Sequence, residues 1–401
     1  MEQKIIKNKL KYFVSALFTL FVLGATGVLN AAVFQDQNKQ IESFKQYKGK
    51  VVDASSNKEL IFATISIENT NITTVTNTEG DFSLKVPTSI KNANVHISFL
   101  GYKSKQIALA DLKENNNNIS LETSILELSE VNIIVPKNAK ELVLETFKKK
   151  GDNYFEDPTL MTAFYRETIK KRRKNVSLSE AVVNIHKTSY ASNQKDDVEL
   201  YKARKSTDYD KLDTLALKLQ GGPFNALFVD VMKYPEYIFT DETLELYTYT
   251  FDRSTRINGK LIYVINFRQK EEMLDQLYEG QLFIDVENKI LTSAIFNLNI
   301  TDKYEAASMF VRKKPAKANV FPTEIAYRVD YREKDNKWYY GYSNVMMEFK
   351  INWDDRLFNS VYSMTCEMAV TDWEKNVTDR LKNKQKLRKN IILSDEAIGF
   401  S

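Results

Sequence analysis

Histidine and cysteine are almost absent from this sequence. Its 401 residues include two histidines, His96 and His186, and a single cysteine, Cys366. One cysteine cannot close an internal disulfide. A zinc site needs several nitrogen or sulfur ligands at suitable spacing, and neither histidine has a glutamate three residues further on. We therefore predict no metal site, no cofactor and no disulfide, and a structural role for His96.

Catalytic motifs are also missing. There is no GxSxG elbow and no glycine-rich phosphate loop. Ser192 and Lys195 fit an SxxK spacing, but they lie in a polar stretch without a partner motif. Cys366 alternates with apolar residues, which favours a buried small side chain over a nucleophile. The adjacent Asp354 and Asp355 would face opposite sides of a strand. No catalytic residue is predicted, and the chain is not expected to be an enzyme.

Glycine and proline are scarce, whereas aromatic residues are plentiful. The chain has 12 Gly and 7 Pro against 21 Tyr and 23 Phe, with 43% hydrophobic and 27% charged residues. This is the composition of a folded protein that favours β-strands. The formal net charge is only +4, so a nucleic-acid partner is not expected.

A long hydrophobic run is missing too, but a short one lies near the start. Residues 13–29 are uncharged and mostly apolar, and they follow Lys4, Lys7, Lys9 and Lys11. This pattern predicts a signal peptide over residues 1–32, cleaved among the small residues that end it. A membrane anchor is the alternative, although a spanning helix needs about 20 apolar residues. No cysteine lies there to carry a lipoprotein anchor. We predict an exported, periplasmic protein, with association with the outer membrane left open, and a polar leader over residues 33–46.

Residues 47–134 have the pattern of a small β-domain. Short alternating stretches are separated by polar turns, which is typical of an antiparallel sandwich. We expect strands at 48–53, 62–68, 72–76, 82–86, 95–100, 103–109 and 119–121.

The order of motifs in this stretch resembles a known family. GKVVDASSNKELIFATISIENTNITTVTNTEGDFSLKVP is followed by VHISFLGYKSKQI and then by LELSEVNII. This series is similar to the carboxypeptidase regulatory-like domain, a prealbumin-like β-sandwich of many exported Bacteroidetes proteins. The resemblance implies a scaffold that accompanies other domains and has no catalytic part of its own.

The turn at TNTEGDF has two interpretations. Asn77, Glu79 and Asp81 could offer oxygens to Ca²⁺, but the rest of a calcium loop is missing. In the family that the domain resembles, the segment is a hairpin corner, with Gly80 in a conformation that other residues disfavour and Phe82 turned inward. We therefore predict a structural turn and no ligand there.

A second domain is expected over residues 138–401. Asn138 is a good N-cap, Glu141 could complete a capping box, and Gly151 could end a helix at 139–150. Strands follow at 161–169, 176–187, 244–251, 260–268, 278–286, 290–300, 323–332, 337–353 and 360–371. We expect a loop at 195–213, a short helix at 221–233 and a basic C-terminal helix at 377–390.

Hairpin-linked strands of this length predict a large curved antiparallel sheet, like a half-barrel, with the 139–150 helix on its concave side. The segment GQLFIDVENKILTSAIFNLN weakly resembles a strand pair of LolA-like half-barrel carriers. Two basic clusters are expected in solvent: the turn at 170–174, and residues 380–389, which could also contact an anionic surface.

The function predicted from these observations is non-catalytic binding or scaffolding at the cell envelope. A lipid, a glycan or an envelope protein could be the ligand, and no ligand-binding residue or oligomeric state is indicated. The alternative is a small outer-membrane β-barrel that carries a periplasmic regulatory-like domain, although charged residues on both strand faces disfavour it.

Overall fold

The computed structural model describes residues 43–60, 63–68, 70, 72–76, 79–99, 102–123, 138–172, 174–207, 222–257, 260–271, 276–311, 314, 316–354, 359–375, 377 and 387. The predicted signal peptide and most of the leader lie outside these residues. So does the linker between the two predicted domains, whose boundaries stay a prediction. Among the described residues, no helix is both long and apolar enough to cross a membrane.

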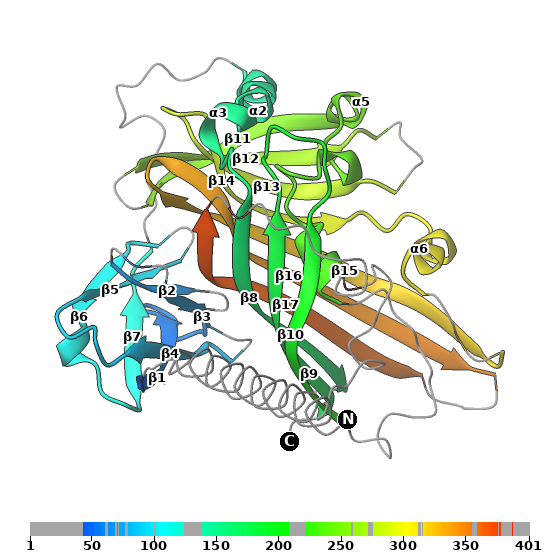
Figure 1. Ribbon diagram of the computed structural model, residues 1–401. Coiled ribbons are helices and arrows are strands. Elements are labelled where there is room, and N and C mark those ends of the chain that lie inside the picture. Colours follow the sequence, from blue (N-terminus) through cyan, green and yellow to red (C-terminus); the bar gives the residue numbers. More distant parts are fainter. Residues whose placement is uncertain are drawn as a thin grey trace, which may run out of the picture. The chain divides into compact units, whose positions relative to one another are not determined.

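The first domain consists of two small sheets (Figure 1). One has the order β4-β1-β7 and the other the order β3-β2-β5-β6. The strands are β1 (Phe44–Asp53), β2 (Thr64–Ile67), β3 (Thr73–Val75), β4 (Asp81–Pro87), β5 (Asn94–Ser98), β6 (Lys105–Ala108) and β7 (Asn117–Leu121), with a short 3-10 helix η1 (Leu109–Asp111). The predicted strands are confirmed. The expectation of purely antiparallel pairing was wrong in one place, because β1 and β7 run parallel.

The core of this domain follows from strand alternation. Along β4, every second side chain is buried and those between are exposed, as a sheet with one face on the core requires. Gly80 has a φ of 74°, and Phe82 is only 4% exposed. Phe99 and Tyr102 pack with ring centroids 5.2 Å apart. The corner that the sequence predicted is therefore structural, with Glu79 and Asp81 both exposed to solvent.

The second domain is built on one ten-stranded sheet of order β10-β9-β8-β17-β16-β15-β14-β13-β12-β11, strongly curved in Figure 1. The strands are β8 (Thr159–Lys171), β9 (Lys174–Lys187), β10 (Asp197–Thr207), β11 (Tyr247–Ile257), β12 (Lys260–Gln269), β13 (Tyr278–Asp285), β14 (Ile290–Leu298), β15 (Ala318–Lys334), β16 (Lys337–Trp353) and β17 (Ser360–Lys375). All pairs are antiparallel, and β17 returns to pair with β8. The described strands leave β10 and β11 as the two edges, so the sheet is open, unlike the closed barrel of the alternative prediction.

Short helices accompany this sheet. They are α2 (Ala139–Lys148), α3 (Lys150–Asn153), α4 (Pro223–Leu227), η3 (Pro235–Tyr237), α5 (Asp241–Leu244) and α6 (Lys303–Phe310). The cap predicted for the first helix is confirmed, because the Asn138 side chain accepts a hydrogen bond from the Lys140 amide at 3.0 Å. The predicted end was wrong. The helix stops at Lys148, and Gly151 lies within α3. This break brings the buried Tyr154 to the sheet, where its hydroxyl donates to the Leu291 carbonyl at 2.6 Å.

The predicted loop at 195–213 was wrong, because residues 197–207 form edge strand β10. An edge strand needs only one apolar face, and charged side chains on it discourage pairing with other chains. A register shift between Leu200 and Lys202 also breaks the alternation. The polar composition of an edge strand therefore concealed it in the sequence.

The predicted C-terminal helix lies almost wholly outside the described residues. The two that are described within it, Val377 and Leu387, are not helical. The Leu387 amide donates to the Val198 carbonyl of β10 at 2.7 Å, and Leu387 is only 7% exposed. A long-range contact with the sheet edge therefore replaces the local helical bond at this residue.

Candidate functional site

One face of the large sheet, here called the inner face, carries the buried side chains against which residues 222–246 pack. Strand register arranges these side chains in three neighbouring rows across six strands. The covered row consists of Val329, Ser343, Met368, Tyr165, Ala181 and Ala203. The polar row consists of Tyr327, Val345, Cys366, Glu167, Ser179 and Lys205. The methionine row consists of Ile325, Met347, Met364, Ile169, Ser177 and Thr207.

The beginning of the 222–246 segment lies on the covered row. The Tyr165 hydroxyl accepts a hydrogen bond from the Gly222 amide at 3.0 Å. The Ser343 hydroxyl donates to the Ala226 carbonyl at 2.6 Å. Because α4 begins at Pro223, these two bonds fix the helix above β8 and β16. The helix predicted at 221–233 is present but shorter, because only residues 223–227 are helical, and it covers part of the inner face.

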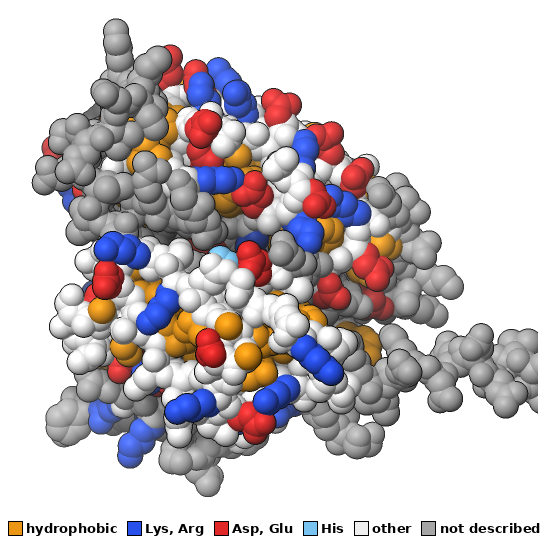
Figure 2. Space-filling view, turned by 90° about the vertical axis from the view of Figure 1, so that its left-hand side faces the viewer, with side chains coloured by type: hydrophobic (Ala, Val, Ile, Leu, Met, Phe, Trp, Pro, Cys, Tyr) orange, Lys and Arg blue, Asp and Glu red, His pale blue; other side chains and the backbone are white. Residues whose placement is uncertain are grey.

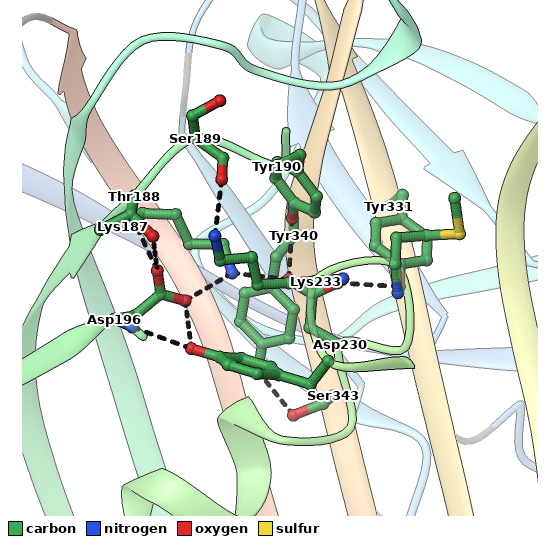
Figure 3. Close-up of polar contacts among 12 residues, drawn as sticks. Lys187, Thr188, Ser189, Tyr190, Asp196, Asp230, Lys233, Tyr331, Tyr340 and Ser343 are labelled. Carbon is green, nitrogen blue, oxygen red and sulfur yellow. Dashed lines mark hydrogen bonds and ion pairs between the residues drawn. The ribbon is translucent and has the colours of Figure 1, made fainter. Parts of the chain in front are cut away.

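A buried ion network holds the middle of the same segment (Figure 3). The Lys187 ammonium, on β9, lies 2.8 Å from an Asp196 carboxylate oxygen and 2.6 Å from an Asp230 carboxylate oxygen. The three side chains are 1%, 0% and 0% exposed. The ammonium also lies 4.9 Å from the Tyr190 ring centroid and 5.4 Å from that of Tyr234, a cation–π arrangement.

Both carboxylates also accept hydrogen bonds from neighbouring hydroxyl and amide donors. Asp230 accepts from the hydroxyls of Tyr190 at 2.8 Å and Tyr331 at 2.9 Å. Asp196 accepts from the Tyr234 hydroxyl at 2.6 Å and from the Thr188 amide at 2.8 Å. A buried charge is tolerated when it is paired and hydrogen-bonded in this way. The network therefore ties β9, the 188–196 loop, the 222–246 segment and β15 together.

The charges of the two lysines follow from this setting. Burial disfavours the charged form of Lys187, but the negative charges and hydrogen bonds of Asp196 and Asp230 outweigh this effect. The pKa of Lys187 is therefore raised. Burial, reinforced by the charge of Lys187, lowers the pKa of Lys233 to about 8 against the pull of Asp196. The Lys233 ammonium donates to the carbonyls of Ser189 and Ser192 at 2.5 and 2.7 Å. Every charged group here is occupied by a partner, which is the arrangement of a structural tie and not of a reactive site.

Glu167, in the polar row, lies in a different environment. It is only 4% exposed, and none of the described ion pairs includes it. The Tyr165 hydroxyl donates to it at 3.0 Å, and the Cys366 thiol lies 4.0 Å away. Burial raises the pKa of Glu167, although the bond from Tyr165 opposes the shift. The same burial raises the pKa of the Cys366 thiol. The charge of Lys205 and the Gly222 amide also oppose the shift of Glu167, but burial outweighs them.

Ser179 faces Glu167 across the β8–β9 pair. It is 2% exposed, and its hydroxyl has no hydrogen-bond partner within the part of the chain that the structure describes. An unpaired polar group in the interior costs about 1–3 kcal/mol, so an unused hydroxyl beside a buried carboxyl is unusual in a native protein. Opposite residues of an antiparallel pair have Cβ atoms about 5 Å apart. The two side chains therefore form one polar site between the covered row and the methionine row.

Replacing Glu167 by Gln is expected to flatten the pH dependence of stability. A carboxyl with a raised folded-state pKa contributes its full stability below the ordinary pKa of 4.5. That contribution is lost as the pH rises through the folded-state pKa, because the unfolded chain then binds fewer protons. Wild-type stability should therefore fall relative to Glu167→Gln as the pH rises above the ordinary pKa of 4.5 and through the raised folded-state pKa. Urea unfolding of both proteins across this range measures the difference, and parallel curves would contradict the assignment.

The residues that the sequence singled out do not meet at one place. Cys366 is buried, as predicted. His96, on β5, lies 3.7 Å from Glu68, whereas the Nε2 atom of His186, on β9, is buried without a partner. The Ser192 hydroxyl accepts from the Gln194 amide in its own loop at 3.1 Å. Among the described residues, no group of three or more His, Cys, Asp or Glu side chains could hold a metal ion.

The sequence did not indicate Glu167, Ser179 or Lys187. Glu167 and Lys187 occupy buried positions in the alternation of β8 and β9, where a charged residue interrupts the apolar pattern. That interruption was the available signal. Which charges meet depends on strand register and on the path of residues 222–246.

Charged side chains of both signs are intermixed on the face of the molecule that Figure 2 shows. No continuous basic area is visible there among the described residues. On this face, the distribution resembles the solvated surface of an ordinary folded protein.

Residues 47–133 match the family model of the CarboxypepD_reg-like domain. The predicted resemblance is confirmed, and the chain contains a carboxypeptidase regulatory-like domain over these residues. No curated protein matches the chain.

Distant matches were found among solved structures. A domain from Vibrio parahaemolyticus, named for outer membrane lipoprotein sorting, is 11% identical, with 61% of this chain and 94% of that chain covered and a TM-score of 0.24. A LolA superfamily protein from Nitrosomonas europaea is 8% identical, with 64% and 100% covered and a TM-score of 0.23. A DUF1329 family protein from Desulfovibrio piger is 10% identical, with 60% and 93% covered and a TM-score of 0.24. The LolA superfamily, which the sequence resembled, is thus among the matches. A similarity this distant says nothing about what this chain binds.

Proposed function

We propose that this chain is an exported, non-catalytic binding protein of the cell envelope that holds an apolar chain on the inner face of its large sheet. One observation carries the proposal: the polar site of Glu167 and Ser179 has unused hydrogen-bonding capacity and borders a row of apolar side chains. Ligand sites in proteins combine these features, a mainly apolar surface with a few placed polar groups.

The methionine row is suited to an acyl chain. Ile325, Met347, Met364 and Ile169 lie side by side across β15, β16, β17 and β8, and Ile169 stays partly exposed. Unbranched, polarizable methionine side chains adapt to ligands of variable shape. Ile325, Met347 and Met364 are buried at 0%, 1% and 2% exposure, so an acyl chain would have to separate their present neighbours, starting at the partly exposed Ile169. Because the row is apolar, a lipid is the ligand we favour over a glycan.

Non-catalytic function is favoured by the state of the reactive groups. The ion network is saturated with internal bonds, and burial raises the pKa of Cys366, which opposes formation of a thiolate. The regulatory-like domain implies a scaffold and supplies no catalytic group of its own. The second candidate function is a scaffold for envelope proteins, to which the partly exposed edge strand β10 could contribute.

Native mass spectrometry of protein purified from its own envelope, with lipid extraction of the same sample, tests the proposal. We expect one acyl lipid per chain. Ile169→Trp should fill the end of the methionine row and remove the lipid. Thr168→Trp is the matched control, because residue 168 points to the opposite face of the same strand. An apo mass for the wild type, together with no binding of a fluorescent acyl probe, would leave only the scaffold function.

A further inference from the structure

The two edge strands of the large sheet differ in how they are protected from pairing with a second copy of the chain. Strand β10 carries Lys202 and Lys205 and a register shift next to Lys202, and its Val198 carbonyl accepts the Leu387 amide. Charges, bulges and covering segments are the usual means by which an edge avoids pairing with itself. Residues 247–251 of β11, here called the β11 stretch, form a regular run without a charged residue, a proline or a glycine.

Alternate residues of the β11 stretch direct their main-chain groups away from the sheet. The Lys270 amide donates to the Leu246 carbonyl, and the register of β11 with β12 makes these two residues a hydrogen-bonded pair. Such pairs alternate along an antiparallel ladder, so the amides and carbonyls of Tyr247, Tyr249 and Phe251 point away from β12. Within the described part of the chain, none of these main-chain groups has a hydrogen-bond partner.

Helix α2, which packs beside β11, leads away from this edge. At one end of the helix, Lys140 pairs with Glu245, just before β11. Further along it, Glu145 pairs with Lys289, which lies in the turn between β13 and β14. Strand β13 is separated from β11 by β12, so the helix runs inward across the sheet. Its own buried side chains belong to the core of the inner face, and the helix therefore does not follow the edge.

The β11 stretch matches itself when it is turned end to end. Three aromatic residues that pack on the inner-face core alternate with Thr248 and Thr250, which are exposed. In an antiparallel pair centred on Tyr249, Tyr247 of one chain lies opposite Phe251 of the other. The two threonines lie opposite each other in the same way. Aromatic pairs and threonine pairs both stabilise neighbouring strands, and no like charges meet near the twofold axis.

We propose that the β11 stretch pairs with the β11 stretch of a second copy of this chain, antiparallel and centred on Tyr249. The outward amides and carbonyls of the two strands then bond to each other, and the two large sheets join across a twofold axis. A twofold contact uses the same surface on both copies, which is why a self-matching, uncharged stretch suits a second copy. This interface goes beyond the proposed function and does not involve the site at Glu167.

The size of the contact sets the expected affinity. One pair of short strands buries less surface than a permanent dimer needs. We therefore expect a reversible dimer with a Kd on the order of 10 μM.

Sedimentation equilibrium of the full mature chain, from about 1 to about 300 μM, tests the proposal. The wild type should change from monomer to dimer over this range. Thr248→Lys with Thr250→Lys puts like charges opposite each other and should weaken the dimer by about 10-fold or more. Thr248→Glu with Thr250→Lys puts opposite charges there and should stay within about 3-fold of the wild type. Hydrogen exchange of the Tyr249 amide should slow as the concentration rises, because this amide gains its partner in the dimer.

Tyr201→Lys with Ser206→Lys is the matched control, because it adds the same charge at exposed positions of the opposite edge strand, β10. This variant should associate as the wild type does, and thermal melting confirms that each variant is folded. A monomer at every concentration would overturn the proposal. A dimer that both double-lysine variants leave intact, or that the β10 variant alone weakens, would place the contact outside β11 and overturn it too. Equal weakening by Thr248→Lys with Thr250→Lys and by Thr248→Glu with Thr250→Lys would overturn the register centred on Tyr249.

Discussion

Replacing Lys187 by Met is expected to lower the free energy of unfolding of the large domain by about 3–5 kcal/mol. The substitution removes the ammonium that lies between Asp196 and Asp230 and leaves two carboxylates buried without a cation. Breaking a buried ion pair from one side costs this much, because the remaining charge keeps its desolvation penalty. Urea unfolding, followed by tryptophan fluorescence, measures the change.

Lys140→Met is the matched control. Its pair with Glu245 is also short, at 2.6 Å, but the two side chains are 35% and 59% exposed. A pair this exposed contributes little to stability, because solvent screens it. Adding Asp196→Asn and Asp230→Asn to Lys187→Met should restore part of the stability, because the two uncompensated charges are removed. If Lys187→Met unfolds at the same urea concentration as Lys140→Met, the network does not hold the segment.

Replacing Phe82 by Ala is expected to unfold the regulatory-like domain and leave the large sheet folded. Phe82 is 4% exposed in a core to which the described residues contribute fifteen buried side chains, and deleting a buried phenylalanine side chain costs about 3–5 kcal/mol. A domain of this size has little stability in reserve. Hydrogen exchange should therefore accelerate over residues 47–123 and stay slow over residues 159–375.

Lys85→Ala, at an exposed position of the same strand, should leave exchange unchanged in both regions. This pair of variants also tests the predicted domain division. If Phe82→Ala accelerates exchange in the large sheet as well, the two regions fold as one cooperative unit, and the division at residues 134–138 is wrong. Acyl binding by a folded large sheet in Phe82→Ala would separate the proposed function from the first domain.

The two buried acidic sites illustrate how differently one fold can use a carboxylate. Asp230 has a lysine partner and two tyrosine donors, and it stabilises the path of the chain over the inner face. Glu167 has a tyrosine donor but no ion pair among the described residues. Because a buried carboxyl outside a close ion pair costs stability, its presence next to Ser179, which has no hydrogen-bond partner among the described residues, is the reason we propose ligand recognition there.

Local patterns in the sequence were sufficient for most strands. Alternation of apolar and polar residues and short polar turns predicted each described strand of the first domain, and among the described strands of the second domain they missed β10. Pairing of Ile257 with Lys260 agrees with the expectation that the strands are linked by hairpins. Such signals work because strand periodicity and turn conformation are properties of neighbouring residues.

The tertiary structure decided the features that depend on distant partners. Strand β10 was not predicted because an edge strand needs no continuous apolar face. The non-helical conformation of Leu387 was not predicted because its amide bonds to the Val198 carbonyl, far away in the chain. Glu167, Ser179 and Cys366 come from three strands, and only the register of β8 with β9 and β17 makes them neighbours. The sequence by itself determined most of the strands and which catalytic and metal motifs are missing. Which side chains meet on the inner face was decided by strand order and register, since a one-residue slip would turn each side chain to the opposite face.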